Sequence, residues 1–552
     1  MDAIEEALAR LRATNPIDRA GLSPADPVAA QLRAHGVGFV AVGDAGVGGA
    51  AAGLEDRWHR ALAELRACIV ETAGAPMLRE GGAYPGAWLE STATIGCEVL
   101  DRFVPEVTRA THLAFAAGQR ADGLLPYKIT ADGPAFTQIQ TVTPLARSVW
   151  QHYLSAGRDL DHLARMYEAM ARNDAWLAAH RDSRGTGGVE AFCTFDTGHD
   201  LSPRFWGIPA RCLDGDAARF DPGIPGLPFV APDLTANVAC QREHLALIAE
   251  ELGENPEPWR EKAAASRAAL ERECRIGDRY YDRAADGSHV TIDSDVLLRV
   301  LACGIGDDAQ FGRTLAADLM STRRFLSAGG FTSIALDDPR FDGDHTRNSW
   351  AGPVNALTML RAPAAFEAHG RVAELAVAHR TLLAAMAGHD RFAQCYDPWT
   401  ADAGYTEAYS PSILLYLDMI ERDAGILPRP DGTVWLSGLI PTRLEHGQAV
   451  TATAASRTVA GVRYEVVGDA ERVEVHRDGR RWLSFPHGWR VELDAGGDVD
   501  AVVGLAAHAV SGTLRVDDAT VALALRPNDR AAVRGAAAVT PAGPGFVAPR
   551  AG

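Results

Sequence analysis

Apolar residues recur at three- and four-residue spacings through most of the chain between residues 56 and 425. One such stripe, typical of an amphipathic helix, comprises Leu234, Val238, Leu245, Ile248 and Leu252. Pro232 and Asp233 favour a helix start before it, and Gly253 favours a helix end after it. The same pattern predicts further helices over residues 57–73, 105–120, 143–155, 159–179, 258–273, 291–303, 353–368, 371–387 and 410–423.

The connections between the predicted helices are either short or long. The long ones are rich in glycine and aromatic residues and span residues 75–92, 122–140, 183–230, 322–350 and 389–409. A chain of helical hairpins whose long loops fall at one end forms a ring with a mouth at that end, and loops on a rigid scaffold often carry function. The pattern alone predicts a helical array and leaves the closure of the ring open.

After residue 430 the apolar positions alternate with polar ones. Stretches of this kind, typical of half-buried strands, cover residues 451–467, 473–475, 482–485, 490–493 and 513–525. Asp478 and Gly479 form a hairpin turn signal between two of them. We therefore expect three parts, which are an N-terminal extension over residues 1–55, a helical domain over residues 56–430 and a small all-β, sandwich-like domain over residues 431–552.

A glycine-rich segment near the N-terminus could bind a dinucleotide. Residues 37–42 read as a strand, and Gly46-Val-Gly48-Gly-Ala-Ala51 follows before a predicted helix. However, no second strand ending in an acidic residue appears about 20 residues further on, as that binding mode requires. The segment is therefore better explained as an entry loop, and we expect no cofactor.

Composition and charge argue against some classes of binding partner. The chain of 552 residues is 47% hydrophobic and 23% charged, and its net charge is −18, which argues against a nucleic-acid or anionic-membrane partner. The N-terminal residues lack the pattern of a secretory signal, and no run of about 18 apolar residues occurs. Eight scattered cysteines without a Cys-x-x-Cys pair indicate reduced thiols. We expect a cytoplasmic protein, and the sequence leaves its oligomeric state open.

The candidate chemistry centres on residues 194–206, which read Thr-Phe-Asp-Thr-Gly-His-Asp-Leu-Ser-Pro-Arg-Phe-Trp. Glycine and proline break any periodicity here, so we expect a structured loop. Its carboxylates, Asp196 and Asp200, and the guanidinium of Arg204 suit the hydroxyls of a polyol, and Trp206 can stack on a sugar ring. The alternative is a solvated turn, since Asp, Ser, Gly and Pro are ordinary turn residues.

This loop resembles the Glu-Ser-Gly-x-Asp-x-Ser-x-Arg segment of the inverting six-hairpin glycosidases, which include trehalases, family 63 α-glucosidases and bacterial mannosylglycerate hydrolases. The resemblance covers roughly residues 56–425. It implies a mainly α fold, an (α/α)6 toroid as catalytic domain, with the C-terminal all-β domain outside it. The family's general acid falls on Asp200, and its preceding glutamate falls on the shorter Asp196.

Two further loops carry the resemblance on the N-terminal side. Tyr84-Pro-Gly-Ala-Trp88-Leu-Glu90 is similar to the family's Trp-x-Trp-Asp loop, which implies that Trp88 and Glu90 contact the sugar. The segment containing Gln138 and Gln140 resembles the Gln-Pro-Pro loop that orients the substrate, and a glutamine offers both a donor and an acceptor to vicinal hydroxyls. A packed tryptophan beside a turn and a surface helix cap are the structural alternatives.

A third loop keeps the family pattern only in part. Asn348-Ser-Trp350-Ala-Gly-Pro353 resembles Trp-Arg-Gly-Pro-x-Trp-x-x-Asn, so Trp350 is expected to line the pocket. The family arginine is Ala351 here and its second tryptophan is Asn355, which removes a fork-shaped donor and a stacking plane.

The largest departure concerns the general base. The segment Gln394-Cys-Tyr396-Asp-Pro resembles the family's Glu-x-Tyr-Asn/Asp-Pro, but an amide stands where the family has the basic glutamate. An amide cannot accept a proton from water near neutral pH. Glu407 is our first candidate for this task and Asp397 the second, although either could simply cap the following helix. Gln394 and Tyr396 remain candidates for substrate contacts.

We therefore expect an inverting glycosidase that acts on a small carbohydrate, with no metal. Because the base glutamate is missing, a lyase, epimerase or isomerase on the same scaffold and a non-catalytic sugar-binding protein are the alternatives. Triad, kinase-type and metallohydrolase motifs are absent from the sequence.

Overall fold

The computed structural model describes residues 2–43, 50–72, 74–439, 443–444, 448–535 and 537–551. The glycine-rich segment considered above falls largely in the first gap, so it lies outside the described residues apart from its last two positions, which open helix α4 (Ala50–Cys68).

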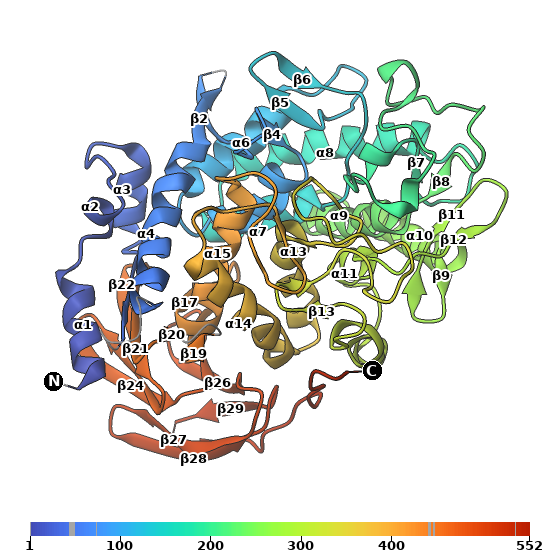
Figure 1. Ribbon diagram of the computed structural model, residues 1–552. Helices are drawn as coiled ribbons and strands as arrows, with labels where there is room; N and C mark the ends of the chain where they lie inside the picture. Colours follow the sequence, from blue (N-terminus) through green and yellow to red (C-terminus); the bar gives the residue numbers. More distant parts are fainter. Residues whose placement is uncertain are drawn as a thin grey trace.

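One set of helices forms the centre of the helical body (Figure 1). It comprises the π-helical turn Ser91–Gly96 with α5 (Cys97–Leu100), α7 (Leu145–Ser155), α9 (Pro232–Glu251), α11 (Val296–Leu301), α13 (Ala356–Ala368) and α15 (Ser410–Ala424). Each packs on the next in this order, and α15 packs back on the π-helical turn and α5. Burial is nearly complete in α15, where 14 of 15 residues are buried.

A second set alternates with the first along the chain. It comprises α4, α6 (Pro105–Ala117), α8 (Leu160–His180), α10 (Glu257–Glu273), α12 (Asp308–Thr314) and α14 (Val372–Gly388). These helices lie further out; α10, for example, buries only 5 of its 17 residues. None of the described helices is long and apolar enough to cross a membrane.

The hydrophobic pattern predicted a helix at ten of these twelve places and missed the π-helical turn with α5 and helix α12. Helix α9 spans the predicted stripe, and Gly253 follows it in the left-handed region at φ +76°, where glycine is favoured. Two predictions were too long. The helix predicted over 57–73 ends at Cys68, because Ile69–Thr72 (β2) pairs instead with Ala75–Leu78 (β3). Of residues 291–303, only α11 is α-helical.

Two antiparallel sheets form the C-terminal part. The first has seven strands in the order β1 (Gly38–Val42), β21 (Ala452–Val459), β22 (Val462–Asp469), β23 (Arg472–Arg477), β24 (Arg480–Pro486), β27 (Val510–Val516) and β28 (Ala519–Leu525). The second has the order β17 (Ile426–Pro428), β18 (Val434–Ser437), β25 (Trp489–Leu493), β26 (Val499–Gly504), β29 (Arg530–Arg534) and β30 (Ala537–Ala538). Residues of both sheets, such as Val475 and Trp489, share one apolar core.

The N-terminal residues join this β region rather than forming a separate extension. Helices α1 (Ala3–Ala13), α2 (Pro16–Arg19) and α3 (Pro27–Ala34) precede β1, which pairs with β21 from Gly38 opposite Ser456 to Val42 opposite Ala452. The ring of Phe39 lies 6.1 Å from that of Trp58 on α4. Strand β1 therefore connects the seven-stranded sheet to the helical body.

The long loops gather at the end of the helical body opposite the sheets (Figure 1). Short strand pairs fix their shape. They are β4 (Ala87–Trp88) with β5 (Lys128–Thr130) and β6 (Gly133–Ala135), β7 (Glu190–Ala191) with β8 (Phe229–Val230), and β15 (Val354–Asn355) with β16 (Cys395–Tyr396). These pairings hold residues that are distant in sequence around one end of the central helices.

Replacing Phe39 with alanine tests the contact between β1 and the helical body. Phe39 is 2% exposed, and removing a buried phenylalanine side chain costs about 3–5 kcal/mol. We expect F39A to lower the midpoint of chemical unfolding accordingly. The control V539A removes an exposed apolar side chain and should stay within about 0.5 kcal/mol of the unaltered protein. Equal effects of the two substitutions would contradict the packing described.

Candidate functional site

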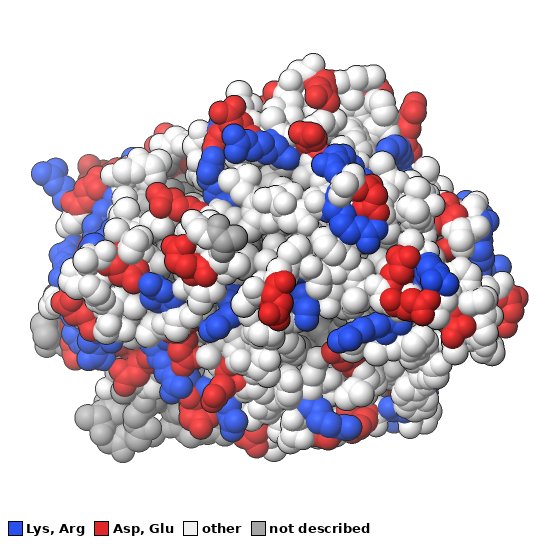
Figure 2. Space-filling view, turned by 90° about the horizontal axis from the view of Figure 1, so that it is seen from above, with Lys and Arg blue, Asp and Glu red and all other residues white. Residues whose placement is uncertain are grey.

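A cavity of about 150 Å³ opens among the loops at this end. It brings together seven of the residues predicted from the sequence, which are Trp88, Glu90, Gln138, Gln140, Asp200, Trp350 and Gln394. The other lining residues are Glu80, Tyr84, Tyr127, Lys128, Phe195, Gly198, Arg211, Asn348 and Leu357. On the face seen from above, acidic and basic side chains are scattered among a majority of uncharged ones (Figure 2).

Asp200 presents a carboxyl group to this cavity. Its Oδ2 accepts a hydrogen bond of 2.5 Å from Nδ2 of Asn348, and its backbone oxygen accepts one of 2.9 Å from the backbone nitrogen of Trp350. Burial, together with the negative charge of Glu90, raises the pKa of the Asp200 carboxyl to about 7. The group can therefore hold a proton near neutral pH.

Glu90 lies next to Asp200 and is held on several sides. Its Oε1 accepts a hydrogen bond of 3.0 Å from Nη2 of Arg361, and its Oε2 accepts one of 3.0 Å from Nε2 of Gln140. Gly198 packs against the same carboxylate, and a Cβ atom there would lie 2.6 Å from Oε2. Gly198 also has φ +64°, so two separate constraints favour glycine at this position.

Gln140, Trp350 and Gln394 complete the buried wall. Oε1 of Gln140 has no hydrogen-bond partner among the described residues, so it is free to bind a ligand hydroxyl. The indole of Trp350 is 1% exposed and packs on the ring of His199. Oε1 of Gln394 accepts a hydrogen bond of 2.5 Å from the hydroxyl of Tyr84.

Asp196 does not reach the cavity, in contrast to the expectation from the sequence. It is fully buried, and the guanidinium of Arg181 pairs with both of its oxygens at 2.6 and 3.1 Å. Backbone nitrogens of Phe192 and Ile139 also donate to it. Asp196 thus ties its own loop to the segment that carries Gln138 and Gln140.

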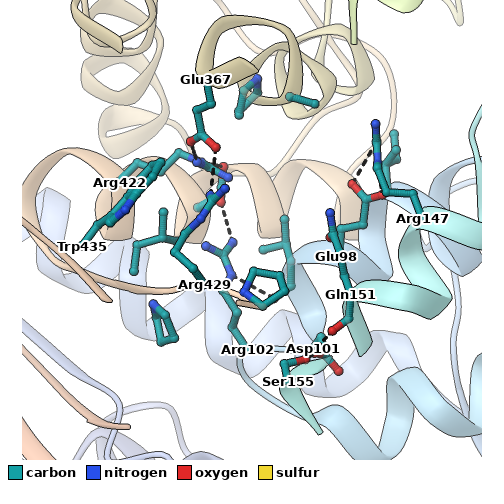
Figure 3. A pocket seen from close by; sticks show the side chains of 18 of the residues that line it. Glu98, Asp101, Arg102, Arg147, Gln151, Ser155, Glu367, Arg422, Arg429 and Trp435 are labelled. Atoms are coloured by element: carbon teal, nitrogen blue, oxygen red, sulfur yellow. Dashed lines mark hydrogen bonds and ion pairs between the residues drawn. The ribbon is translucent and has the colours of Figure 1, made fainter. Parts of the chain in front are cut away.

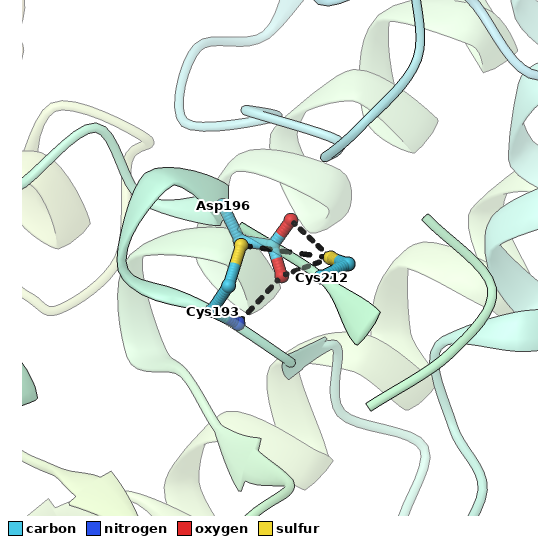
Figure 4. Close-up of side chains that lie close together, drawn as sticks. All are labelled: Cys193, Asp196 and Cys212. Atoms are coloured by element: carbon cyan, nitrogen blue, oxygen red, sulfur yellow. Dashed lines mark hydrogen bonds between the residues drawn. The ribbon is translucent and has the colours of Figure 1, made fainter. Parts of the chain in front are cut away.

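Asp196 also lies between the sulfur atoms of Cys193 and Cys212, close enough for a shared metal ion (Figure 4). The guanidinium of Arg181 already neutralises this carboxylate, and a second cation beside it would be repelled. The donor set therefore does not fit a metal site.

Arg204, Trp206 and Tyr396 also lie outside the cavity. The Arg204 guanidinium bonds both Asp233, at 3.0 and 3.1 Å, and Asp282, at 2.8 and 2.7 Å, so its donors are used inside the protein. The indole of Trp206 is 65% exposed and does not line the cavity. Tyr396 is fully buried, and its hydroxyl lies 2.6 Å from that of Ser412.

The two carboxylates considered as general bases lie elsewhere too. The side chain of Glu407 is exposed, and it does not line the cavity. Oδ1 of Asp397 accepts hydrogen bonds of 2.8 and 2.9 Å from the backbone nitrogens of Trp399 and Thr400, which makes it a turn-capping residue. Its other oxygen lies 3.4 Å from Nδ1 of His345.

The sequence analysis missed Glu80, which lines the cavity and is 5% exposed. Glu80 lies in the long loop 75–92, directly before Gly81 and Gly82 and four residues before Tyr84. An acidic residue beside a glycine pair in a predicted functional loop was the available signal.

A family comparison agrees with this arrangement. A model of the mannosylglycerate hydrolase MGH1-like glycoside hydrolase domain matches residues 84–412, more than half of the chain. The chain belongs to this family. It is a glycosidase, and the matched residues include the cavity-lining residues described above except Glu80.

Solved structures show the same fold for this glycosidase at low sequence identity. The glycoside hydrolase family 63 mannosylglycerate hydrolase from Thermus thermophilus in complex with Tris is 20% identical, with a TM-score of 0.55 over 65% of this chain and 98% of that chain. The same enzyme in complex with Tris and D-glycerate is 19% identical, with a TM-score of 0.54 over 65% of this chain and 99% of that chain. A sialidase is 13% identical, with a TM-score of 0.57 over 84% of this chain and 42% of that chain. No curated protein matches the chain.

A larger cavity of about 610 Å³ lies between the helical body and the β region of the glycosidase (Figure 3). Its charged side chains are mostly paired with one another. Glu367 binds both Arg422 and Arg429, and Arg147 pairs with Glu98 at 2.8 Å. Because these groups satisfy each other, the smaller cavity around Asp200 is the better candidate for the reaction site.

Replacing Arg204 with methionine separates a structural role from substrate binding. The substitution leaves two buried carboxylates without their shared cation, and breaking such a buried pair typically costs about 3–5 kcal/mol. We expect unfolding at a lower denaturant concentration. The control R219M removes an exposed ion pair and should change stability by less than about 1 kcal/mol. A raised KM with unchanged stability in R204M would instead indicate substrate contact.

Proposed function

We propose that this glycosidase hydrolyses a small glycoside with inversion of the anomeric configuration and uses Asp200 as the general acid. We further propose that its central and outer helices form an (α/α)6 toroid. The closed order of contacts among the central helices, in which α15 returns to α5, supports the toroid. The likeness to the Thermus thermophilus enzyme, which extends over nearly all of that chain, supports it as well.

The environment of Asp200 is the observation that carries the proposal. A general acid must hold its proton at the working pH and lie where the leaving oxygen departs. Burial and the charge of Glu90 supply the first condition, since they raise the pKa of Asp200 to about 7. The cavity supplies a place for the leaving group beside the carboxyl.

The walls of the cavity suit a single sugar. Glu90 and Gln140 present oxygen atoms to sugar hydroxyls, while Trp88 and Trp350 offer aromatic surface. Lys128 and the exposed Arg211 add two cations to a lining that is otherwise acidic or neutral. These cations favour an aglycone that carries a carboxylate, so mannosylglycerate is the first substrate to test.

Inversion requires water to attack from the side of the sugar opposite the leaving group. In inverting glycosidases a second carboxylate activates this water, and the two carboxyl groups stand roughly 6.5–9.5 Å apart. By the resemblance of its segment, Gln394 stands in the place of that carboxylate, so we infer that another residue acts in this chain.

Replacing Asp200 with asparagine tests the general acid. We expect D200N to fold normally and to hydrolyse mannosylglycerate about 10²–10⁴-fold more slowly, because the leaving oxygen no longer receives a proton. The loss should be smaller on 4-nitrophenyl α-mannoside, whose leaving group needs little protonation. The control D214N alters an exposed aspartate of the same long loop. An undiminished rate in D200N would remove Asp200 from the mechanism, and proton NMR of the first product tests inversion.

The pH dependence provides a second test. Only protonated Asp200 can act as the acid, so kcat/KM should fall tenfold per pH unit at the alkaline end. The charge of Glu90 helps to raise the pKa of Asp200. We therefore expect E90Q to move the alkaline limb to lower pH, whatever its effect on the maximal rate. A limb that stays in place in E90Q would contradict this electrostatic coupling.

A further inference from the structure

The cavity offers no proton acceptor at the position where related enzymes have one. Gln394 carries an amide, and its Oε1 already accepts a hydrogen bond from Tyr84. Glu407 and Asp397 do not line the cavity. Hydrolysis nevertheless requires a group that takes a proton from the attacking water.

Among the described residues, three carboxyl groups line the cavity, those of Glu80, Glu90 and Asp200. Glu90 is held by Arg361 and Gln140, one on each oxygen. Asp200 is the proposed acid. Glu80 is therefore the carboxyl group that has no task in the proposed reaction.

The backbone around Glu80 is held firmly. Its nitrogen donates to the oxygen of Gly86, and its own oxygen accepts from the nitrogen of Ser410, both at 2.8 Å. Gly81 and Gly82 follow with φ +88° and +55°, and a Cβ atom at either would lie 2.1 Å from an atom of the chain at residues 406–408. Two glycines thus let this loop lie directly against the loop before α15, which fixes where Glu80 points.

The carboxyl group of Glu80 is only half satisfied. Its Oε1 accepts a hydrogen bond of 2.9 Å from the hydroxyl of Tyr409. Its Oε2 is buried and accepts no hydrogen bond within 3.5 Å among the described residues, and the hydroxyl of Ser91, equally unpaired at that distance, is the nearby donor that acts on the carboxyl. Buried polar atoms are normally paired, so an unpaired carboxyl oxygen on a cavity wall indicates a ligand or a water molecule as its partner.

Two tyrosines link Glu80 to Gln394. The ring of Tyr84 is 5.8 Å from the ring of Tyr409, which donates to Glu80, and the hydroxyl of Tyr84 donates to Gln394. Two adjacent tyrosines therefore connect Glu80 to the place where related enzymes carry their base.

We propose that Glu80 is the general base of this glycosidase and takes the place of the carboxylate that is absent at position 394. This assignment rests on the proposed inverting hydrolysis. Oε2 of Glu80 accepts a proton from water while the water oxygen bonds to the anomeric carbon. The glycosidic bond breaks at the same time, and its oxygen takes the proton of Asp200. Both carboxyl groups then return to their starting states by exchange with solvent.

The surroundings of Glu80 make it a strong base once it is ionised. Burial raises the pKa of its carboxyl to about 8 against the opposing hydrogen bonds from Tyr409 and Ser91, and the charge of Glu90 raises it further. Tyr84 lines the same cavity, as do the half-buried Lys128 and the exposed Arg211.

The first test is the isosteric substitution E80Q, which keeps an acceptor for Tyr409. We expect kcat on mannosylglycerate to fall about 10²–10⁴-fold with little change in KM. The loss should be equally large on 4-nitrophenyl α-mannoside, because a base acts on water and not on the leaving group. E71Q, an exposed glutamate on the hairpin before Glu80, is the matched control and should retain the full rate.

The pH profile gives a readout that a structural role would not produce. The active form needs protonated Asp200 and ionised Glu80. Because the pKa of the acid lies below that of the base, this form is a minority at every pH, and kcat/KM should be nearly flat between about pH 7 and 8 and fall on both sides. In E80Q the residual kcat/KM should no longer fall at low pH, because the group whose protonation causes that fall is absent. In E80A, sodium azide should restore turnover by replacing water as nucleophile, with a glycosyl azide of inverted configuration as the product.

Stability provides an independent readout on the folded protein. The pKa of Glu80 is raised from 4.5, so the unfolded chain releases this proton first, and the contribution of Glu80 to the stability of the unaltered protein falls as pH rises from about 5 to 8. E80Q lacks this loss, so its melting temperature relative to the unaltered protein should rise through the same range. A constant difference in melting temperature would overturn the buried, proton-holding state of Glu80.

The outcomes separate this proposal from the proposed function. If E80Q keeps more than a tenth of the rate while D200N is inactive, Glu80 is not the base and the general acid stands. A large loss in E407Q with full activity in E80Q would assign the base to Glu407 instead. An active D200N would overturn the reaction scheme itself.

Discussion

The buried carboxylate of Glu90 organises the candidate reaction site of this glycosidase. Arg361 and Gln140 hold its two oxygens, and the backbone of Gly198 packs against it, which brings the loop of Asp200 to the loop of Trp88. Its negative charge also acts on both neighbouring carboxyl groups. It raises the pKa of Asp200 and that of Glu80, and burial does most of this work. The charge of Glu90 thus affects both the arrangement of these loops and the pKa values of Asp200 and Glu80.

The protein distributes its buried cations unevenly, and this separates the structural carboxylates from those proposed to react. Arg181 neutralises Asp196, and Arg204 neutralises Asp233 and Asp282, so these aspartates are bound inside the protein. Asp200 and Glu80 receive only neutral donors, from Asn348 and Tyr409 respectively. A buried carboxyl group without a cation destabilises a fold, and proteins keep such groups mainly where function requires them.

The two ends of the helical body differ in what covers them: loops that line the small cavity lie at one end, and the β region lies at the other. Residues that precede the central helices, such as Glu90 before Ser91–Gly96 and Gln140 before α7, supply the small cavity. The opposite end is covered by the β region, where Arg429 and Arg422 share Glu367 (Figure 3). Strand β1 ties that region to α4. The β region therefore supports the helices from behind, and the loops on the other side are free to carry chemistry.

The sequence by itself determined most of the helices, because an apolar stripe of period 3.6 has few ways to be buried, as α9 shows. It also indicated the loops that line the cavity and Asp200 among them, since glycines, aromatic residues and carboxylates cluster there. It could not tell which carboxylates face the cavity. Asp196 and Asp200 are four residues apart, yet Gly198 with φ +64° turns the chain between them, so that one meets Arg181 and the other the cavity. Only the tertiary structure placed Glu80 beside Tyr409, 329 residues away, and β1 beside β21, because such contacts depend on how distant segments pack and leave no period in the sequence.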